Sequence, residues 1–132
     1  MQLKFAVLVP HSEYKNFLED LFQTKLTPQE AGLFIFDREI KIQDGVTLKD
    51  PRRTLKESVE APQTITFFLE VALGLPIAIV GTIVGEYIFS RLKKVSWLKI
   101  GDTQPQINIE DIRKAIREEL EKIKDKNNDS QR

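Results

Sequence analysis

The stretch that decides the fold is Phe67–Phe89, FFLEVALGLPIAIVGTIVGEYIF, which lies in the middle of a 132-residue chain. Only two charged residues interrupt it, Glu70 and Glu86, and a basic cluster follows it. As one helix rising about 1.5 Å per residue, this stretch would reach roughly 34 Å, enough to cross a hydrocarbon core of about 30 Å. The pattern therefore predicts an apolar helix over residues 65–90 that spans or anchors in a membrane, with the C-terminal side in the cytoplasm.

Small residues recur within this predicted helix, at Gly74, Ala78, Gly81 and Gly85. At 100° per residue they fall within about 60° of one another and form one stripe. Glycine in a water-exposed helix costs about 1 kcal/mol relative to alanine, and small residues four apart let two helix backbones approach closely. We therefore expect the stripe to be a helix-packing interface, through which the chain self-associates or binds a partner protein.

Charged and aromatic residues flank the apolar stretch. Interfacial anchors are expected at Arg91, Lys93, Lys94 and Trp97, because basic and indole side chains suit the headgroup region. Trp97 fits a buried strand equally well. Glu70 borders the glycine stripe and is the candidate functional acid, because a carboxylate inside a helix oligomer can line a polar path or bind a basic group.

A second interpretation stays open. Helices buried inside a globular domain also lack charge, and glycine stripes also seat helices on sheets. If residues 65–90 span a membrane, the strands predicted at Leu3–Val9 and Val95–Ile100 lie on opposite sides and cannot share a sheet, and each half is small for a core of its own. The alternative is a cytoplasmic α+β interaction domain whose apolar helix is buried against its sheet or in an oligomer interface.

The N-terminal segments predict an α+β fold. Leu3–Val9 is apolar and β-branched, which is typical of a strand, and the apolar residues of Tyr14–Phe22 follow a helical period. Residues 33–43 predict one long strand or two short ones. Asp44 and Gly45 then predict a tight hairpin turn, because such turns need positive φ.

The C-terminal segments predict a hairpin and a helix. Val95–Ile100 and residues 104–107 are expected to pair, and Asn108 is expected to cap an amphipathic helix. The chain is thus expected to divide into a β-α-β-β unit (1–49), a linker (50–64), the apolar helix (65–90), a β-hairpin with an amphipathic helix (91–126) and a tail (127–132).

The composition argues against several classes of function. Twenty Lys and Arg residues balance twenty Asp and Glu residues, which argues against a nucleic-acid partner. There is no cysteine, and His11 is the only histidine, which argues against thiolate chemistry and zinc. His11 and Ser12 are neighbours at a strand-to-helix corner and point in different directions. We expect no catalytic residue, no cofactor, no metal and no small-molecule substrate, and hence a protein that is not an enzyme.

The order of predicted elements resembles the small effector-associated constant components of bacterial conflict systems. The residues that carry the resemblance are Val71–Gly74, Phe89–Lys94 and Val95–Ile100 running into Ile107–Leu120. The resemblance implies a non-enzymatic accessory that links or localises an effector, and it transfers no catalytic residue. Together with the apolar helix, it leads us to expect a small membrane-associated interaction protein whose partners are membrane lipid and a second copy or another protein.

Overall fold

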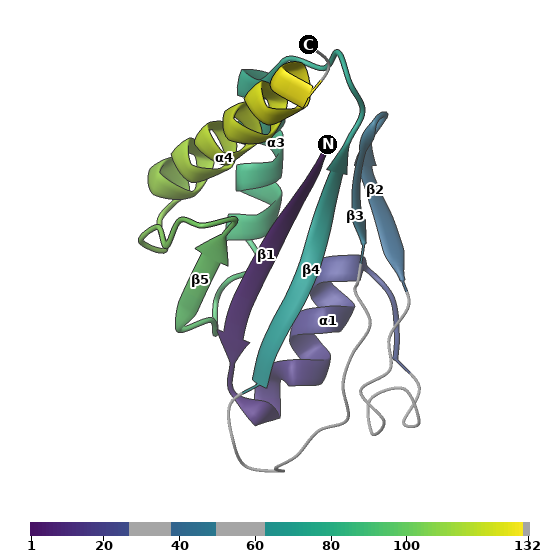
Figure 1. Cartoon of the computed structure of the whole chain (residues 1–132). Coiled ribbons are helices and arrows are strands. Elements are labelled where there is room, and N and C mark those ends of the chain that lie inside the picture. Colours follow the sequence, from purple (N-terminus) through teal and green to yellow (C-terminus); the bar gives the residue numbers. More distant parts are fainter. Residues whose placement is uncertain (27–37, 50–62, 131–132) are drawn as a thin grey trace.

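Residues 1–26, 38–49 and 63–130 of the computed structural model are described here, with the backbone alone for residues 63 and 127–130. They form one antiparallel sheet in the order β2-β3-β4-β1-β5 together with three α-helices (Figure 1). The strands are β1 (Gln2–Val9), β2 (Glu39–Gln43), β3 (Val46–Lys49), β4 (Gln63–Val71) and β5 (Trp97–Ile100). The helices are the 3-10 turn η1 (His11–Glu13), α1 (Tyr14–Phe22), α3 (Ile77–Phe89) and α4 (Ile109–Ser130). The predicted mixed α+β class is confirmed.

The apolar stretch is divided between two elements, so the predicted single helix over residues 65–90 was wrong. Its first part belongs to β4, and α3 begins only at Ile77, after a turn in which Gly74 has a φ of 92°. Pro76 is the N-cap of α3, where a residue without a backbone N–H donor loses nothing. With 13 residues, α3 is about 20 Å long.

Across the described ranges, none of the helices combines the length and the apolar character that crossing a membrane requires.

β4 is a strand because its apolar side chains alternate. Every second residue from Ile65 to Val71 is buried, whereas the residues between them are partly or fully exposed. β4 pairs with β1 along its whole length, and the ring of Phe5 stacks on that of Phe67 with centroids 5.1 Å apart. On its other side β1 pairs with β5, where Phe5 lies opposite Ile100. Strands from both ends of the chain therefore share one sheet, which the membrane interpretation excluded.

The N-terminal predictions are largely confirmed. The strand and helix expected there are β1 and α1, and the turn at Asp44 and Gly45 joins β2 to β3, with Gly45 at a φ of 82°. Residues 33–37 of the predicted strand region and residues 50–62 of the predicted linker lie outside the described residues. Residues 63 and 64, which were also assigned to the linker, belong to β4.

At the C-terminal end, the predicted hairpin was wrong and the predicted helix is confirmed. Residues 104–107 form no strand, and a single bridge between Ile100 and Thr103 closes the turn after β5. Asn108 caps α4, because its Oδ1 accepts a hydrogen bond of 2.8 Å from the backbone N–H of Asp111. Pro105 contributes no backbone donor, which disfavours a paired strand.

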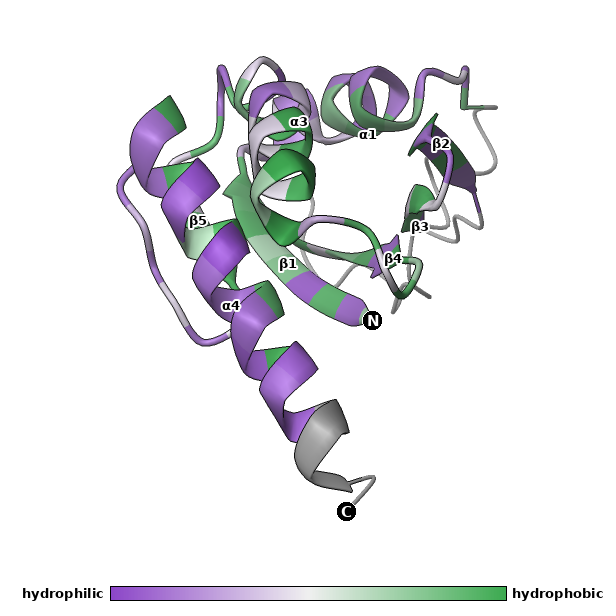
Figure 2. Cartoon of the chain, turned by 90° about the horizontal axis from the view of Figure 1, so that it is seen from above, coloured by the Kyte–Doolittle hydropathy of each residue, from purple (hydrophilic) through white to green (hydrophobic). Residues whose placement is uncertain are grey.

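The helices cover the sheet unequally. Figure 2 shows α1 and α3 on the same side of the sheet and α4 crossing beside α3. The buried residues of α1, α3 and α4 join those of the strands in one hydrophobic core. α4 contributes Ile112, Ile116 and Leu120, each fully buried.

A buried carboxylate fixes α4 to the turn after β5. Glu119 is only 4% exposed and accepts hydrogen bonds from the Asp102 N–H at 3.0 Å and the Thr103 hydroxyl at 2.7 Å. Burial by itself would raise the pKa of Glu119, but these two hydrogen bonds and the charge of Lys122 outweigh it and hold the pKa below its ordinary value. Gly101 is required beside it, because a Cβ there would lie 2.8 Å from the Glu119 carboxyl carbon.

We predict that Glu119→Gln lowers the free energy of unfolding by about 1–3 kcal/mol near neutral pH, because hydrogen bonds to a charged acceptor are lost. A depressed folded-state pKa contributes stability above the unfolded-state pKa, and this contribution disappears as pH falls through the folded-state pKa. The difference between wild type and variant should therefore be constant near neutral pH and shrink as the pH falls below about 4.3, the ordinary pKa of a glutamate. Urea unfolding of both proteins at several pH values measures this difference in the free energy of unfolding. Glu118→Gln on the exposed side of α4 is the matched control, and an equal pH dependence for wild type and Glu119→Gln would contradict the assignment.

Candidate functional site

The predicted glycine stripe is split by the fold. Gly74 lies in the turn before α3, where a Cβ would meet nothing within 4 Å, and Ala78 is exposed. Gly81 and Gly85 are buried against α4. A Cβ at Gly85 would lie 2.6 Å from Arg113 Cγ and 3.4 Å from Arg113 Cα. These two glycines do let two helices approach closely, and the second helix is α4 of the same chain.

The basic residues expected to be interfacial anchors have different surroundings. The Arg91 guanidinium lies 3.7 Å from the centroid of the Tyr87 ring and donates hydrogen bonds to the carbonyl oxygens of Asp20 and Tyr87, both at 3.0 Å. It thereby joins α1 to α3. Lys93 and Lys94 are exposed beside it and help to line a small cavity of about 190 Å³.

Tyr87 also joins α3 to α1. Its hydroxyl donates a hydrogen bond of 2.6 Å to the carbonyl oxygen of Leu21. Burial raises the pKa of Tyr87, and the positive charge of Arg91 counters only part of that effect. Trp97 lies apart from this junction, half-buried on β5 opposite Leu8 and on the opposite side of the strand from the buried Leu98.

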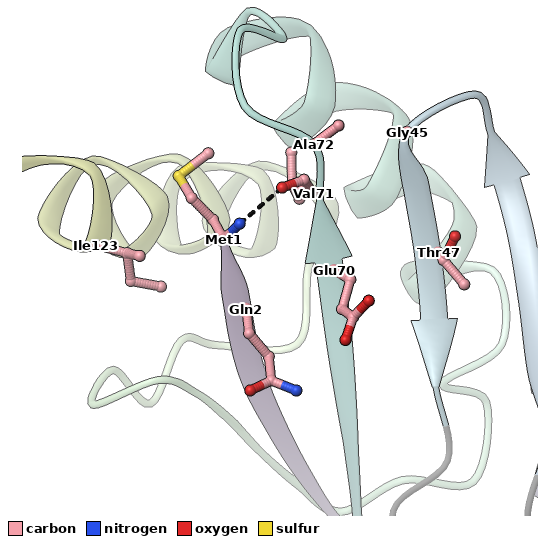
Figure 3. A pocket seen from close by; sticks show the side chains of 8 residues that line it. All are labelled: Met1, Gln2, Gly45, Thr47, Glu70, Val71, Ala72 and Ile123. Carbon is pink, nitrogen blue, oxygen red and sulfur yellow. Dashed lines mark hydrogen bonds between the residues drawn. The ribbon is translucent and has the colours of Figure 1, made fainter. Parts of the chain in front are cut away.

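Glu70, the candidate functional acid, lies on β4 and not on a helix. It is paired in the sheet with Gln2 on one side and Thr47 on the other, at an open depression of about 590 Å³ where β1 begins and β4 ends (Figure 3). Ile123 of α4 forms part of the wall. The Glu70 carboxylate forms an ion pair with Lys49, with 2.9 Å between Glu70 Oε2 and Lys49 Nζ. The hydrogen bond to Glu70 and the negative charge of Glu70 raise the pKa of Lys49.

The chemistry of this depression is modest. The Glu70 carboxylate is paired with Lys49, and the Met1 ammonium donates a hydrogen bond of 2.8 Å to the carbonyl oxygen of Val71, so the charged groups at this depression are already engaged within the chain. Within the described ranges, no group of three or more His, Cys, Asp or Glu side chains is arranged to hold a metal ion.

A different surface stands out, on α3 and the turn before it. Among the described residues, the exposed large apolar side chains are Leu73, Ile79 and Phe89, at 75%, 53% and 37%. All three belong to α3 or to the turn that leads into it. Single exposed apolar residues are ordinary, but several on one element mark an interaction surface. We call Leu73, Ala78, Ile79 and Phe89 the outer surface of α3.

The outer surface of α3 continues into a groove against α4. The groove has a volume of about 630 Å³, and Ala78 and Ile77 of α3 form its apolar wall. Charged residues of α4 form the opposite wall: Lys114, Arg117, Glu118, Glu121 and Lys122. Figure 2 shows the contrast, with α3 mainly hydrophobic and the neighbouring side of α4 mainly hydrophilic. An apolar wall opposite a charged wall of mixed sign is the arrangement that an amphipathic partner fits.

Reasoning from the sequence missed this groove, although part of the signal was present. The apolar residues of α3 continue around the whole helix, and only one side of a helix in a two-layer fold can face the sheet. Because Val80 and Val84 are buried in the core, Ala78 and Ile79 remain exposed on another side of the helix. What could not be foreseen is which residues of α4 lie opposite them.

The chain matches no protein-family model, and neither the curated proteins nor the solved structures include a match to it.

We predict that Gly85→Leu lowers the free energy of unfolding by about 1–3 kcal/mol, because the new side chain overpacks the contact with Arg113. Thermal and urea unfolding measure the change. Thr82→Leu adds the same side chain at an exposed position on the same helix and should change stability by less than about 0.5 kcal/mol. Equal effects of the two substitutions would show that α4 does not pack on Gly85 in solution.

Proposed function

We propose that this chain is a small non-enzymatic interaction domain that binds another polypeptide through the outer surface of α3. The observation that supports this most is the exposure of Leu73 and Ile79, at 75% and 53%, whereas most of the other large apolar side chains among the described residues are buried. Leaving such side chains in water has no benefit for folding, whereas covering them on binding releases roughly 25 cal/mol per Å² of apolar surface.

The charges around this surface favour a protein over a lipid headgroup layer. An anionic membrane surface attracts an excess of basic residues, whereas the α4 wall of the groove interleaves Lys114 and Arg117 with Glu118 and Glu121. Glu86, on the exposed side of α3, also carries negative charge and pairs with Arg113. Mixed charge around an apolar centre is typical of protein–protein interfaces.

In the context of the resemblance to effector-associated components, this binding would link an effector to a second protein. The resemblance rests on Val71–Gly74, Phe89–Lys94 and Val95–Ile100 running into Ile107–Leu120. The last of these segments includes the first half of α4, the helix that forms the charged wall of the groove. The proposed role needs a stable scaffold that presents α3, and it needs no catalytic group.

The proposal predicts that a photoreactive phenylalanine analogue at position 79 forms a discrete covalent adduct with another polypeptide in cells of the source organism. The same analogue at Lys15, an exposed residue of α1, is the matched control and should form none. Mass spectrometry of the adduct identifies the partner. Adding Leu73→Asp to the position-79 chain should reduce the adduct at least tenfold, because burying an unpaired carboxylate is costly.

Three outcomes would contradict the proposal. These are no adduct at position 79, the same products at positions 79 and 15, and adducts of position 79 with lipid alone. Circular dichroism spectra and unfolding curves of the Leu73→Asp chain distinguish loss of binding from loss of fold, since Leu73 is exposed and its replacement should leave the fold intact.

A further inference from the structure

Two charged side chains in the groove have no ion-pair or hydrogen-bond partner among the described residues. Lys114 is paired with Glu118 at 3.9 Å, and Lys122 with the buried Glu119 at 3.5 Å. Neither Arg117 nor Glu121 takes part in an ion pair or side-chain hydrogen bond within the part of the chain that the structure describes. The groove therefore presents one free positive and one free negative charge, four residues apart on α4.

Arg117 is held in place by the glycine contact between α3 and α4. A Cβ at Gly81 would lie 2.5 Å from Arg117 Cγ and 3.3 Å from its Cδ, so the aliphatic part of Arg117 lies directly on the α3 backbone. Its guanidinium is thus presented at the groove, where less conformational entropy is lost when it forms an ion pair. A planar guanidinium suits a carboxylate, with which it can form two parallel hydrogen bonds.

We infer that the polypeptide bound at the outer surface of α3 is a second copy of this chain, related to the first by a two-fold axis. In a two-fold interface, if residue i of one copy contacts residue j of the other, then j also contacts i. One free arginine and one free glutamate on the same helix satisfy this rule by themselves. Arg117 of each copy would meet Glu121 of the other, and Ile79 and Leu73 would be covered between the two copies.

Two further properties agree with self-association. The net charge is zero, so two copies do not repel one another overall. A standard interface buries about 800 Å² per partner, which is about a tenth of the 7919 Å² of surface that this chain exposes. Ala78 belongs both to the outer surface of α3 and to the groove, so the two surfaces adjoin one another. This inference rests on the proposed function, because it names the partner of the same surface.

The test is a set of charge reversals measured by sedimentation equilibrium. Arg117→Glu and Glu121→Arg should each weaken self-association at least tenfold, because two attractive contacts become two repulsive ones. The double variant, Arg117→Glu with Glu121→Arg, should restore it, since each pair is then reversed but complementary. A mixture of the two single variants should also associate, because every contact between unlike copies joins a glutamate to an arginine. Lys15→Glu is the control and should leave association unchanged.

The results separate this inference from the proposed function. A chain that stays monomeric up to its solubility limit, or charge reversals that neither weaken nor rescue association, overturn the second-copy inference. If position 79 is then crosslinked to a different protein, the proposed function stands with another partner. If position 79 forms no adduct either, both fail.

Discussion

The pairing of β4 with β1 is the constraint on which the rest of the structure depends. It requires Phe67–Val71 to be extended, and this leaves only Ile77–Phe89 for a helix. It also places β1 between β4 and β5, so that the N-terminal strand is flanked by two strands that come much later in the sequence. The stacked rings of Phe5 and Phe67 lie at the centre of this arrangement, with their planes 9° apart. Every feature of the α3 surface follows from the shortening of the helix by this strand.

Much of the fold can be read from the sequence, because local rules decide it. The period of Tyr14–Phe22, the turn at Asp44 and Gly45 and the cap at Asn108 each depend on neighbours a few residues apart. The apolar stretch was misjudged because Phe68 lies on the exposed side of β4 and hides the alternation that Thr64, Thr66 and Glu70 otherwise show. Gly74 and Pro76 mark the true boundary, but glycine and proline also occur in membrane helices.

The candidate site was harder to foresee, because it depends on contacts between distant segments. The glycine stripe correctly indicated a close approach at Gly81 and Gly85, but a stripe cannot tell whether its partner lies in the same chain. In the sequence, Arg117 is one of several basic residues that alternate with acids along α4. Only the structure shows that Lys114 pairs with Glu118, whereas Arg117 and Glu121 pair with none of the residues that it describes. Glu70 attracted attention because it is a charged residue in an apolar stretch of sequence. In the structure it lies on a strand and forms an ion pair with Lys49, which accounts for its charge.

The position of β1 in the sheet has a consequence for biosynthesis. Gln2 of β1 pairs with Glu70, so 68 residues separate the two partners, and its other neighbour, β5, comes later still. At about 5–20 residues per second, roughly 3–14 s of translation pass between the two strands. During that interval a strand with four buried apolar residues has neither of its sheet neighbours. β1 is thus made before either of the strands that flank it, so the pairing of the sheet around β1 belongs to the later part of synthesis.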